Sequence, residues 1–237
     1  MLIRPSDALF LDFDGTLVPF AARPESVLVP PALPQTLKRL ETALEGALAI
    51  VTGRPIGQID DHLQRAVAHV AGEHGAVLRL DGAARTNPDL PDISALLDSV
   101  RCAIAQLEGV WIEQKTAGFA VHFRAHPQAE KTVHGVLETA LADSSDFERL
   151  LGDHVAEVRA KGVNKGTALR QMMARGPFAG RRPVFIGDDV TDEDGFSAAQ
   201  ALGGFGVKVG PGATCALERL EDCAAVHTSL ARCLDRP

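Results

Sequence analysis

The sequence predicts an α/β fold in which a parallel sheet forms one unit and a smaller α+β unit is inserted into it. Short apolar runs alternate with segments of helical period along most of the chain, which is typical of parallel strands joined by helices. The first apolar run ends in Asp12 and Asp14, and sheets of this class bind ligands at the carboxyl ends of their strands. In the middle of the chain two strands follow each other directly, which indicates a separate unit.

The first half of the chain accounts for one side of the predicted sheet. Strands are short apolar runs and helices carry apolar residues three and four positions apart. This pattern predicts strands at 9–13, 47–51 and 69–71, and helices at 34–44 and 56–66. Residues 75–80, followed by Asp81 and Gly82, predict a hairpin at the edge of the sheet, because Asp-Gly favours a tight turn.

The inserted unit follows a linker marked by Asn87, Pro88 and Pro91. Its predicted order is αββαβ, with helices at 93–107 and 128–141 and strands at 111–115, 119–124 and 155–159. The larger unit then resumes with a helix at 165–175 and strands at 183–187 and 206–209. The predicted domains are therefore 1–88 and 161–237 for the core and 89–160 for the insertion.

Composition and charge limit the kinds of molecule that this protein is expected to bind. The chain has 237 residues and a formal net charge of −7, without the basic stripe of a nucleic-acid-binding protein. No apolar segment is long enough to span a membrane, and acidic residues interrupt the apolar run near the N-terminus, so neither a membrane anchor nor a signal peptide is expected. The four cysteines lack C-x-x-C or zinc spacing, which favours reduced thiols. We expect a cytoplasmic monomer that acts on a small molecule.

Two carboxylates at the end of the first strand are the strongest chemical signal. Residues two apart on a strand share a face, so Asp12 and Asp14 should project together. Adjacent carboxylates repel unless a cation or a shared proton relieves them. The alternative is that Asp14 and Gly15 form the turn of a hairpin.

Three further signals follow other predicted strands or begin a helix. Thr52 ends the run 47–51 and offers a hydroxyl, Lys165 begins a helix, and residues 187–194 form an acidic loop. Taken singly, Thr52 could cap the next helix, Lys165 could be solvated, and the acidic loop could cap a helix through Thr191 and Asp194. Together, a carboxylate pair, a hydroxyl, a lysine and an acidic loop describe a phosphoryl-transfer site with oxygen ligands for Mg²⁺.

These motifs give the chain a clear resemblance to a known superfamily. DFDGT, the Thr52-Gly53 pair, Lys165 and GDDVTDE resemble the four motifs of the haloacid dehalogenase (HAD) phosphatases. Within that superfamily the chain resembles the trehalose-6-phosphate phosphatases through six blocks: TGR, EHGA, WIEQKTAGFAVHFR, AEVRAKGVNKG, RPVFIGDDVTDEDGF and VKVGPGAT. Thr52 stands where many members carry serine, which keeps the hydroxyl. The resemblance implies a Rossmann-like parallel-sheet core with an inserted cap of C2 type.

The resemblance also implies a reaction, the Mg²⁺-dependent hydrolysis of trehalose 6-phosphate to trehalose and phosphate, the last step of trehalose biosynthesis. Asp12 would be the nucleophile that forms an aspartyl-phosphate. Asp14 would first protonate the leaving sugar oxygen and then activate water. Thr52 and Lys165 would neutralise phosphate oxygens.

The same resemblance implies metal-binding and positioning roles for five acidic residues. Mg²⁺ would be held by the carboxylates of Asp12 and Asp188 and by the backbone carbonyl of Asp14. Asp189 and Asp192 would hold ligands, waters or the lysine in place, with Asp192 the better candidate for a contact to a metal-bound water.

Substrate recognition is expected from both units. In the core, Asp14, Gly15, Thr16 and Arg54 are the candidates. In the insertion, the resemblance places the glucose units on Glu113, Lys115 and Glu157, with His122 and Arg124 as weaker candidates. Glu113 and Lys115 alternate on one strand, and the alternative is a surface salt bridge between them. Residues 87–91 and 160–162 would be hinges for cap motion.

Two other functions stay open from the sequence. The nearest is a phosphatase for another sugar phosphate, such as sucrose or glucosylglycerol phosphate, since only the cap residues separate these activities. The other is a non-catalytic domain that senses a sugar phosphate or binds a synthase. A functional link to trehalose-6-phosphate synthase is also an expectation.

Overall fold

The computed structural model describes residues 3–20, 27–80, 82–87 and 90–234. The chain divides into two compact units, one made of Met1–Thr86 with Asn164–Pro237 and the other of Asn87–Val163. We call them the core unit and the inserted unit. Pro88 of the expected linker and Asp81 of the expected hairpin turn lie outside the described residues.

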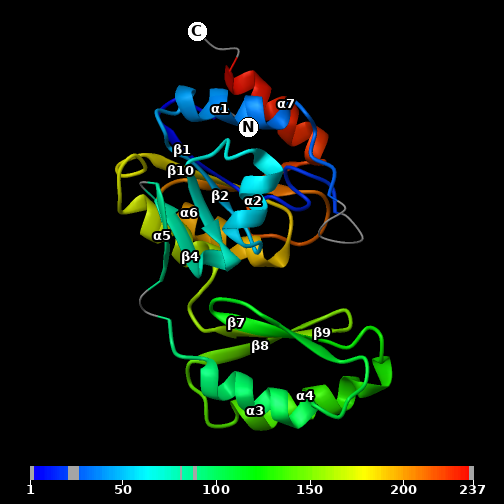
Figure 1. Cartoon of the computed structure of the whole chain (residues 1–237). Helices are drawn as coiled ribbons and strands as arrows, with labels where there is room; N and C mark the ends of the chain where they lie inside the picture. The colour runs from blue at the N-terminus through cyan, green and yellow to red at the C-terminus, as the bar shows by residue number, and fades with distance from the viewer. Residues whose placement is uncertain (1–2, 21–26, 81, 88–89, 235–237) are drawn as a thin grey trace. The chain divides into compact units, whose positions relative to one another are not determined.

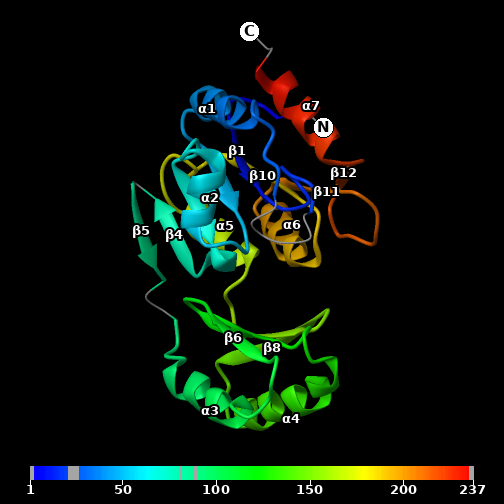
Figure 2. The same cartoon turned by 45° about the vertical axis from the view of Figure 1, so that its right-hand side comes forward.

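The core unit is built on one eight-stranded sheet in the order β12-β11-β10-β1-β2-β3-β4-β5. Its strands are β1 (Asp7–Leu11), β2 (Leu48–Val51), β3 (His69–Gly72), β4 (Val77–Leu80), β5 (Ala83–Thr86), β10 (Arg182–Gly187), β11 (Phe205–Val209) and β12 (Glu218–Leu220). The strands from β12 to β3 are parallel, whereas β4 and β5 are antiparallel and form one edge (Figure 2). The α/β class and the edge hairpin predicted from the sequence are confirmed.

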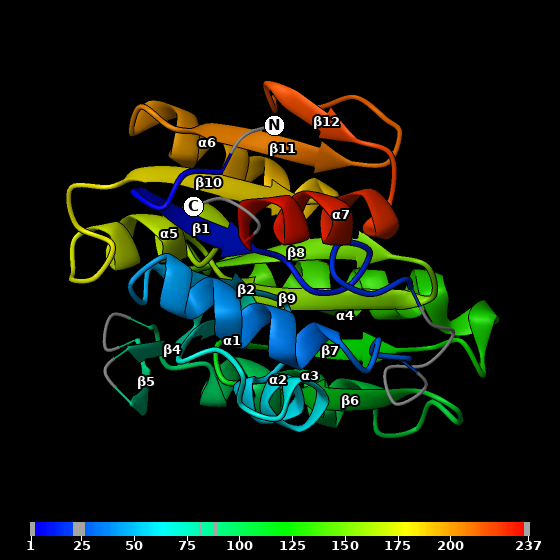
Figure 3. The same ribbon diagram turned by 90° about the horizontal axis from the view of Figure 1, so that it is seen from above.

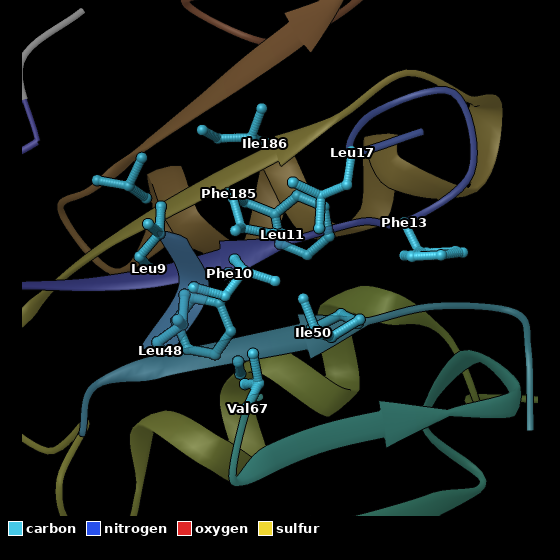
Figure 4. Close-up of a cluster of buried hydrophobic side chains, with 14 of the residues drawn as sticks. Leu9, Phe10, Leu11, Phe13, Leu17, Leu48, Ile50, Val67, Phe185 and Ile186 are labelled. Carbon is cyan, nitrogen blue, oxygen red and sulfur yellow. The ribbon is translucent and has the colours of Figure 1, made fainter. Parts of the chain in front are cut away.

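The central strands are buried along their whole length. β1 pairs in parallel with β2 and β10, and all five of its residues are buried. Apolar side chains of these three strands, among them Phe10, Leu48 and Phe185, fill the centre of the core (Figure 4). Parallel sheets covered on both faces need such continuous apolar strands, which is why the sequence signal was strong here.

Helices cover both faces of the core sheet. α1 (Leu33–Ala43) and α7 (Cys223–Leu234) lie side by side over one face, and α5 (Lys165–Met173) and α6 (Glu193–Ala201) over the other (Figures 1 and 3). The other helical segments among the described residues of this unit are α2 (Ile56–Leu63) and the 3₁₀ turns η2 (Glu73–Gly75) and η4 (Val190–Asp192). Within the described ranges, none of the helices combines the length and apolar character that a bilayer crossing requires.

The inserted unit is a four-stranded antiparallel sheet in the order β6-β7-β9-β8, with its two helices on one face (Figure 1). Its elements are α3 (Ser94–Ile104), β6 (Trp111–Gln114), β7 (Gly118–His122), η3 (Pro127–Ala129), α4 (Glu130–Leu141), β8 (Phe147–Gly152) and β9 (Val155–Ala160). The observed order of elements is αββαββ. The order αββαβ expected from the sequence therefore lacks one strand. The omitted strand β8 is an edge strand of mixed exposure, so its sequence FERLLG shows no alternation of apolar and polar residues.

The two faces of this sheet differ in chemistry. Phe119 and Val158 are register partners, are fully buried and lie on the face that the helices cover. Glu113, Ala120 and Glu157 are aligned across β6, β7 and β9 on the opposite face. Within this unit, that second face is free of helices and carries polar side chains.

Candidate active site

Asp12 is a buried carboxylate directly after β1. Its backbone N–H donates to the carbonyl of Ile186 on β10 at 2.9 Å, which anchors the loop to the sheet. The Nζ of Lys165 donates to Oδ1 of Asp12 at 2.7 Å, and both side chains are at most 5% exposed. Burial raises the pKa of Asp12 well above its usual value, an effect that Lys165 opposes and Asp192 reinforces.

Lys165 stands in the first turn of α5 and carries two carboxylate partners. Asn164 caps the helix by accepting from the N–H of Thr167 at 2.8 Å. Nζ of Lys165 also donates to Oδ1 of Asp192 at 2.7 Å. Burial alone would lower the pKa of Lys165, but the two carboxylates outweigh it and raise that pKa, so the side chain is an ammonium.

The acidic loop after β10 is ordered by Asp192. Its Oδ2 accepts hydrogen bonds from the backbone N–H groups of Asp188 and Asp189 at 2.9 Å each. Asp189 in turn accepts from the N–H of Val190 at 2.7 Å and caps the turn η4. A capping box thus exists in this loop, but Asp189 and Asp192 form it rather than the pair Thr191 and Asp194 considered from the sequence.

Three carboxylates from the two loops lie together. Asp12, Asp188 and Asp192 each offer one oxygen, and these oxygens are within 4.8 Å of one another. Burial and, second, the charge of Asp192 raise the pKa of Asp188 to about 6. Lys165 balances only one of the three charges, so the cluster favours a further cation. The cluster offers only carboxylate oxygens, which are hard donors of the kind that Mg²⁺ prefers, so the residues present fit this metal.

Gly15 and Thr16 hold the first loop against Asp188. Gly15 has a φ of +76°, and a Cβ there would lie 2.2 Å from Oδ2 of Asp188. The hydroxyl of Thr16 donates to Oδ1 of the same carboxylate at 3.2 Å. The buried Lys208 on β11 donates to the backbone carbonyl of Asp188. Sequence reasoning missed Lys208, whose only signal was a lysine within an otherwise apolar strand.

Asp14 lies in the same loop but has a different partner. β1 ends at Leu11 and pairs with parallel strands on both sides, so Asp14 and Gly15 close no hairpin. Nε and Nη2 of Arg54 donate to the two oxygens of Asp14 at 2.6 and 2.7 Å. The carboxylates of Asp12 and Asp14 therefore have different cations as partners, Lys165 and Arg54.

Thr52 directly follows β2 and is buried. Its hydroxyl oxygen accepts from the N–H of Arg54 at 3.1 Å, ahead of α2, whose cap residue Pro55 makes no side-chain cap bond. Thr52 therefore orders the turn that carries Arg54. A Cβ at Gly53 would lie 2.8 Å from the ring of His74, so a larger residue here would force that ring to move.

The candidate residues of the inserted unit do not form the salt bridge that was considered from the sequence. Nζ of Lys115 donates to Oε1 of Glu157 at 3.0 Å, whereas Glu113 contacts Nε2 of His122 at 2.9 Å. The considered salt bridge between Glu113 and Lys115 is thus replaced by two cross-strand pairs. Arg124 follows β7 and pairs with Asp153 at 2.9 Å, where both side chains are more than two-thirds exposed.

Solved structures identify the fold. A trehalose-6-phosphate phosphatase related protein superposes with a TM-score of 0.73 at 26% identity, covering 95% of this chain and 96% of that one. A sugar phosphatase of HAD subclass IIB shares the fold with a TM-score of 0.64 at 17% identity, covering 95% and 97%. The chain has the HAD fold, an α/β core with an additional antiparallel sheet.

Sequence relatives define the family. The family described as "Trehalose-phosphatase" matches residues 10–215. The chain is 41% identical over 206 residues to a probable trehalose-phosphate phosphatase of Sinorhizobium fredii, covering 86% of this chain and 78% of the relative. It is 39% identical over 215 residues to the trehalose-6-phosphate phosphatase of Escherichia coli, covering 90% and 81%. The chain belongs to the trehalose-phosphatase family and is a phosphoric monoester hydrolase.

One further relative is much longer than this chain, and its name combines two activities. The chain is 32% identical over 235 residues to a bifunctional trehalose-6-phosphate synthase/phosphatase of Thermoproteus tenax. The match covers 94% of this chain but only 31% of that relative.

Proposed function

We propose that this protein hydrolyses trehalose 6-phosphate to trehalose and phosphate through an aspartyl-phosphate on Asp12, with Mg²⁺ as cofactor. The observation that carries the proposal is the buried Asp12 carboxylate, which contacts Lys165 at 2.7 Å and shares an acidic cluster with Asp188. A carboxylate beside a fixed cation and a metal site is suited to attack a phosphate dianion, because those charges offset the repulsion.

The proposed reaction has two steps that use the same pair of acids. In the first, a carboxylate oxygen of Asp12 attacks phosphorus and the bond to the sugar oxygen breaks, while Asp14 gives its proton to that oxygen. In the second, Asp14 takes a proton from water as the water oxygen attacks phosphorus and frees the Asp12 carboxylate. Lys165 and Thr52 stabilise the charge on the transferring group, and Arg54 orients Asp14 through two hydrogen bonds.

The metal would be held by the carboxylates of Asp12 and Asp188 and the backbone carbonyl of Asp14, with Asp192 in contact with a metal-bound water. When bound, Mg²⁺ neutralises negative charge on the phosphate and fixes its orientation. Asp192 supports this site in a second way, because it holds the Asp188 loop through two backbone N–H groups. Asp189 would order the same loop by capping η4.

Specificity for the disaccharide would come from the polar face of the inserted sheet, acting as a cap. Glu113, Lys115, His122 and Glu157 are paired across strands on that face, and pairs of this kind present several polar and charged hydrogen-bonding groups to sugar hydroxyls. Arg124 would contribute from the end of β7, and Gly15 and Thr16 would contact the phosphate group from the core. We further propose that residues 160–162 act as a hinge of this cap.

A substrate panel tests the proposal directly. Phosphate release should be fast with trehalose 6-phosphate, much slower with sucrose 6-phosphate and glucose 6-phosphate, and abolished by a chelator of divalent cations. Restoring Mg²⁺ should restore the rate. Equal rates on all three sugar phosphates would refute the substrate assignment, and a rate that survives the chelator would refute the cofactor.

We propose a functional link to a trehalose-6-phosphate synthase, which would supply the substrate. The bifunctional relative from Thermoproteus tenax supports this link, because its name combines both activities. The four cysteines are all free thiols, which supports a reducing compartment such as the cytoplasm.

A further inference from the structure

The inserted unit carries the single tryptophan of the chain on the uncovered face of its sheet. Trp111 begins β6 and its side chain is 56% exposed. Its register partner on β7 is His122, and the two rings stack with centroids 4.1 Å apart and planes 12° from parallel. A tryptophan usually buries most of its large surface, so an indole held at the surface by a stacked neighbour requires a reason.

The orientation of this indole is fixed by a chain of contacts. Nε2 of His122 is 2.9 Å from Oε2 of Glu113, which holds the imidazole in place. Trp111 and Glu113 are two residues apart on β6, so they project from the same face of the sheet. We call Trp111, Glu113 and His122 the Trp111 cluster. Its aromatic and acidic groups are pre-organised, which lowers the entropy cost of binding a ligand.

One face of the indole is left open by the position of β6. In the sheet order β6 is an edge strand, with β7 as its neighbour. His122 on β7 covers the indole from that side. On the other side of β6 the described part of the unit places no strand, and more than half of the Trp111 side chain is exposed, so we take the second ring face to be available to a ligand.

The surroundings of Trp111 favour a polar ligand over an apolar protein surface. Within the described part of the inserted unit, the exposed large apolar side chains are Trp111 and Leu151. Leu151 is the register partner of Ala156, whose side chain is buried on the helix-covered face, so it lies on the opposite face of the sheet from Trp111. A lone aromatic ring among charged side chains does not form the apolar patch that protein partners bury.

We propose that the open face of Trp111 is a stacking platform for one glucose ring of the disaccharide, an inference that rests on the proposed function. A glucopyranose ring carries its hydroxyls around the rim and exposes C–H groups on both faces, so it can lie flat on an indole. Glu113 is about 7 Å along the strand, at a rise of about 3.4 Å per residue. That distance places its carboxylate at the rim of a ring stacked on Trp111, where it accepts hydrogen bonds from hydroxyl groups.

Intrinsic fluorescence gives a direct test, because the chain has one tryptophan and no tyrosine. Trehalose titrated into the wild-type protein should change the emission of Trp111 in a saturable way, whereas sorbitol at equal concentration should not. The concentration for half-saturation should rise in Glu113→Ala. Unchanged emission at trehalose concentrations that inhibit hydrolysis of trehalose 6-phosphate would overturn the inference.

Kinetics give a second test with matched variants. Trp111→Ala should raise KM for trehalose 6-phosphate by about 3- to 10-fold, the size expected for one aromatic contact. It should leave kcat on a small aryl phosphate unchanged, and Trp111→Phe should recover most of the affinity. Leu151→Ala, which removes an exposed apolar side chain from the opposite face, should change neither constant.

The two proposals fail in different ways. If the wild-type protein does not hydrolyse trehalose 6-phosphate, the proposed function is refuted. If it does, and Trp111→Ala has the same KM as Leu151→Ala, only the platform is refuted.

Discussion

Arg54 fixes the orientation of Asp14 through two parallel hydrogen bonds, from Nε to Oδ2 at 2.6 Å and from Nη2 to Oδ1 at 2.7 Å. The guanidinium group also lies 5.6 Å from the ring centroid of Phe13. A fork of two donors is specific to arginine, because a lysine ammonium is a point charge that cannot match both carboxylate oxygens. The geometry of Asp14 thus depends on the shape of its partner as well as on its charge.

Replacing Arg54 by lysine should therefore lower kcat although the positive charge is kept. We expect a loss of about 10- to 100-fold in phosphate release from trehalose 6-phosphate, a part of the about 10²- to 10⁴-fold that a positioned general acid–base group contributes. Arg65→Lys is the matched control, since Arg65 is largely exposed and contacts Asp60 at 3.6 Å. Equal kcat in Arg54→Lys and the wild type would show that Asp14 needs no oriented partner.

Asp12→Asn should abolish turnover while the fold survives. The amide keeps the shape of the side chain but cannot form an acyl phosphate in its place. The control is Asp7→Asn, at the opposite end of the same strand. Asp7 is also buried and pairs with Arg182 at 2.8 and 3.0 Å.

Activity and thermal unfolding should separate these two variants. Asp7→Asn should lower the melting temperature and leave kcat near its wild-type value, because it breaks a partly buried ion pair far from the chemistry. Asp12→Asn should keep its circular dichroism spectrum and release no phosphate. Residual turnover near the wild-type rate in purified Asp12→Asn would exclude Asp12 as the nucleophile.

Asp188→Asn should stabilise the metal-free protein and remove its response to Mg²⁺. The pKa of Asp188 is raised to about 6, above its value in the unfolded chain, so the ionised carboxylate opposes folding above pH 6 and this cost vanishes below about pH 4. Solvent screens this partly exposed group, so the gain at pH 7.5 should be about 1 kcal/mol, or about 2–4 °C in melting temperature.

Adding Mg²⁺ should raise the melting temperature of the wild type above that of Asp188→Asn. A ligand present at about 100 times its dissociation constant stabilises the folded state by about 2.7 kcal/mol. Differential scanning fluorimetry with a chelator and with Mg²⁺ should therefore show a rise for the wild type and little change for Asp188→Asn. A wild-type melting temperature that does not change when Mg²⁺ is added would argue against a metal at this cluster.

The sequence predicts best those elements whose apolar pattern is continuous. β1, β2 and β10 are buried on both faces, and their runs of leucine, isoleucine and phenylalanine have few other interpretations. The edge strands β8 and β12 were not predicted, because exposure on one side lets polar residues occupy positions that would otherwise be apolar.

At the candidate site, the sequence predicts the functional residues but not the pairs that they form. The sequence predicts which residues end the strands, but it does not say which cation meets which carboxylate. Lys165 contacts Asp12 and Asp192 although it lies 153 and 27 residues away from them along the chain. Such long-range pairing depends on how α5 packs beside the sheet, and no local pattern encodes it. The same holds for Arg54 with Asp14.

Glu113→Ala should raise KM for trehalose 6-phosphate far more than for a small aryl phosphate. Glu113 lies on the polar face of the inserted sheet and contacts His122 at 2.9 Å, so its loss would remove the charged acceptor that we propose for sugar hydroxyls. We expect an increase of about 10- to 100-fold, as for a hydrogen bond to a charged group. Asp98→Ala on α3 removes an exposed carboxylate that contacts Arg101 at 3.5 Å and should change neither KM. Equal losses on both substrates would instead indicate misfolding.

Two glycine substitutions should have opposite effects on stability. At Gly15 the backbone φ is +76°, and an added Cβ would lie 2.2 Å from Oδ2 of Asp188, so Gly15→Ala must displace the loop or the carboxylate. At Gly57, in the first turn of α2, an added Cβ would meet no heavy atom within 4 Å.

Gly57→Ala should therefore raise the free energy of unfolding by about 0.5–1 kcal/mol with unchanged kcat, as expected for alanine in a helix. Gly15→Ala should lower that free energy by about 1–3 kcal/mol and reduce phosphate release at least about 100-fold, a loss typical of misplaced reacting groups. Chemical denaturation and phosphate release, measured on both variants, separate the two outcomes. Wild-type kcat in Gly15→Ala would show that the loop carrying Asp12 and Asp14 can shift away from Asp188 without cost, which the proposed site does not allow.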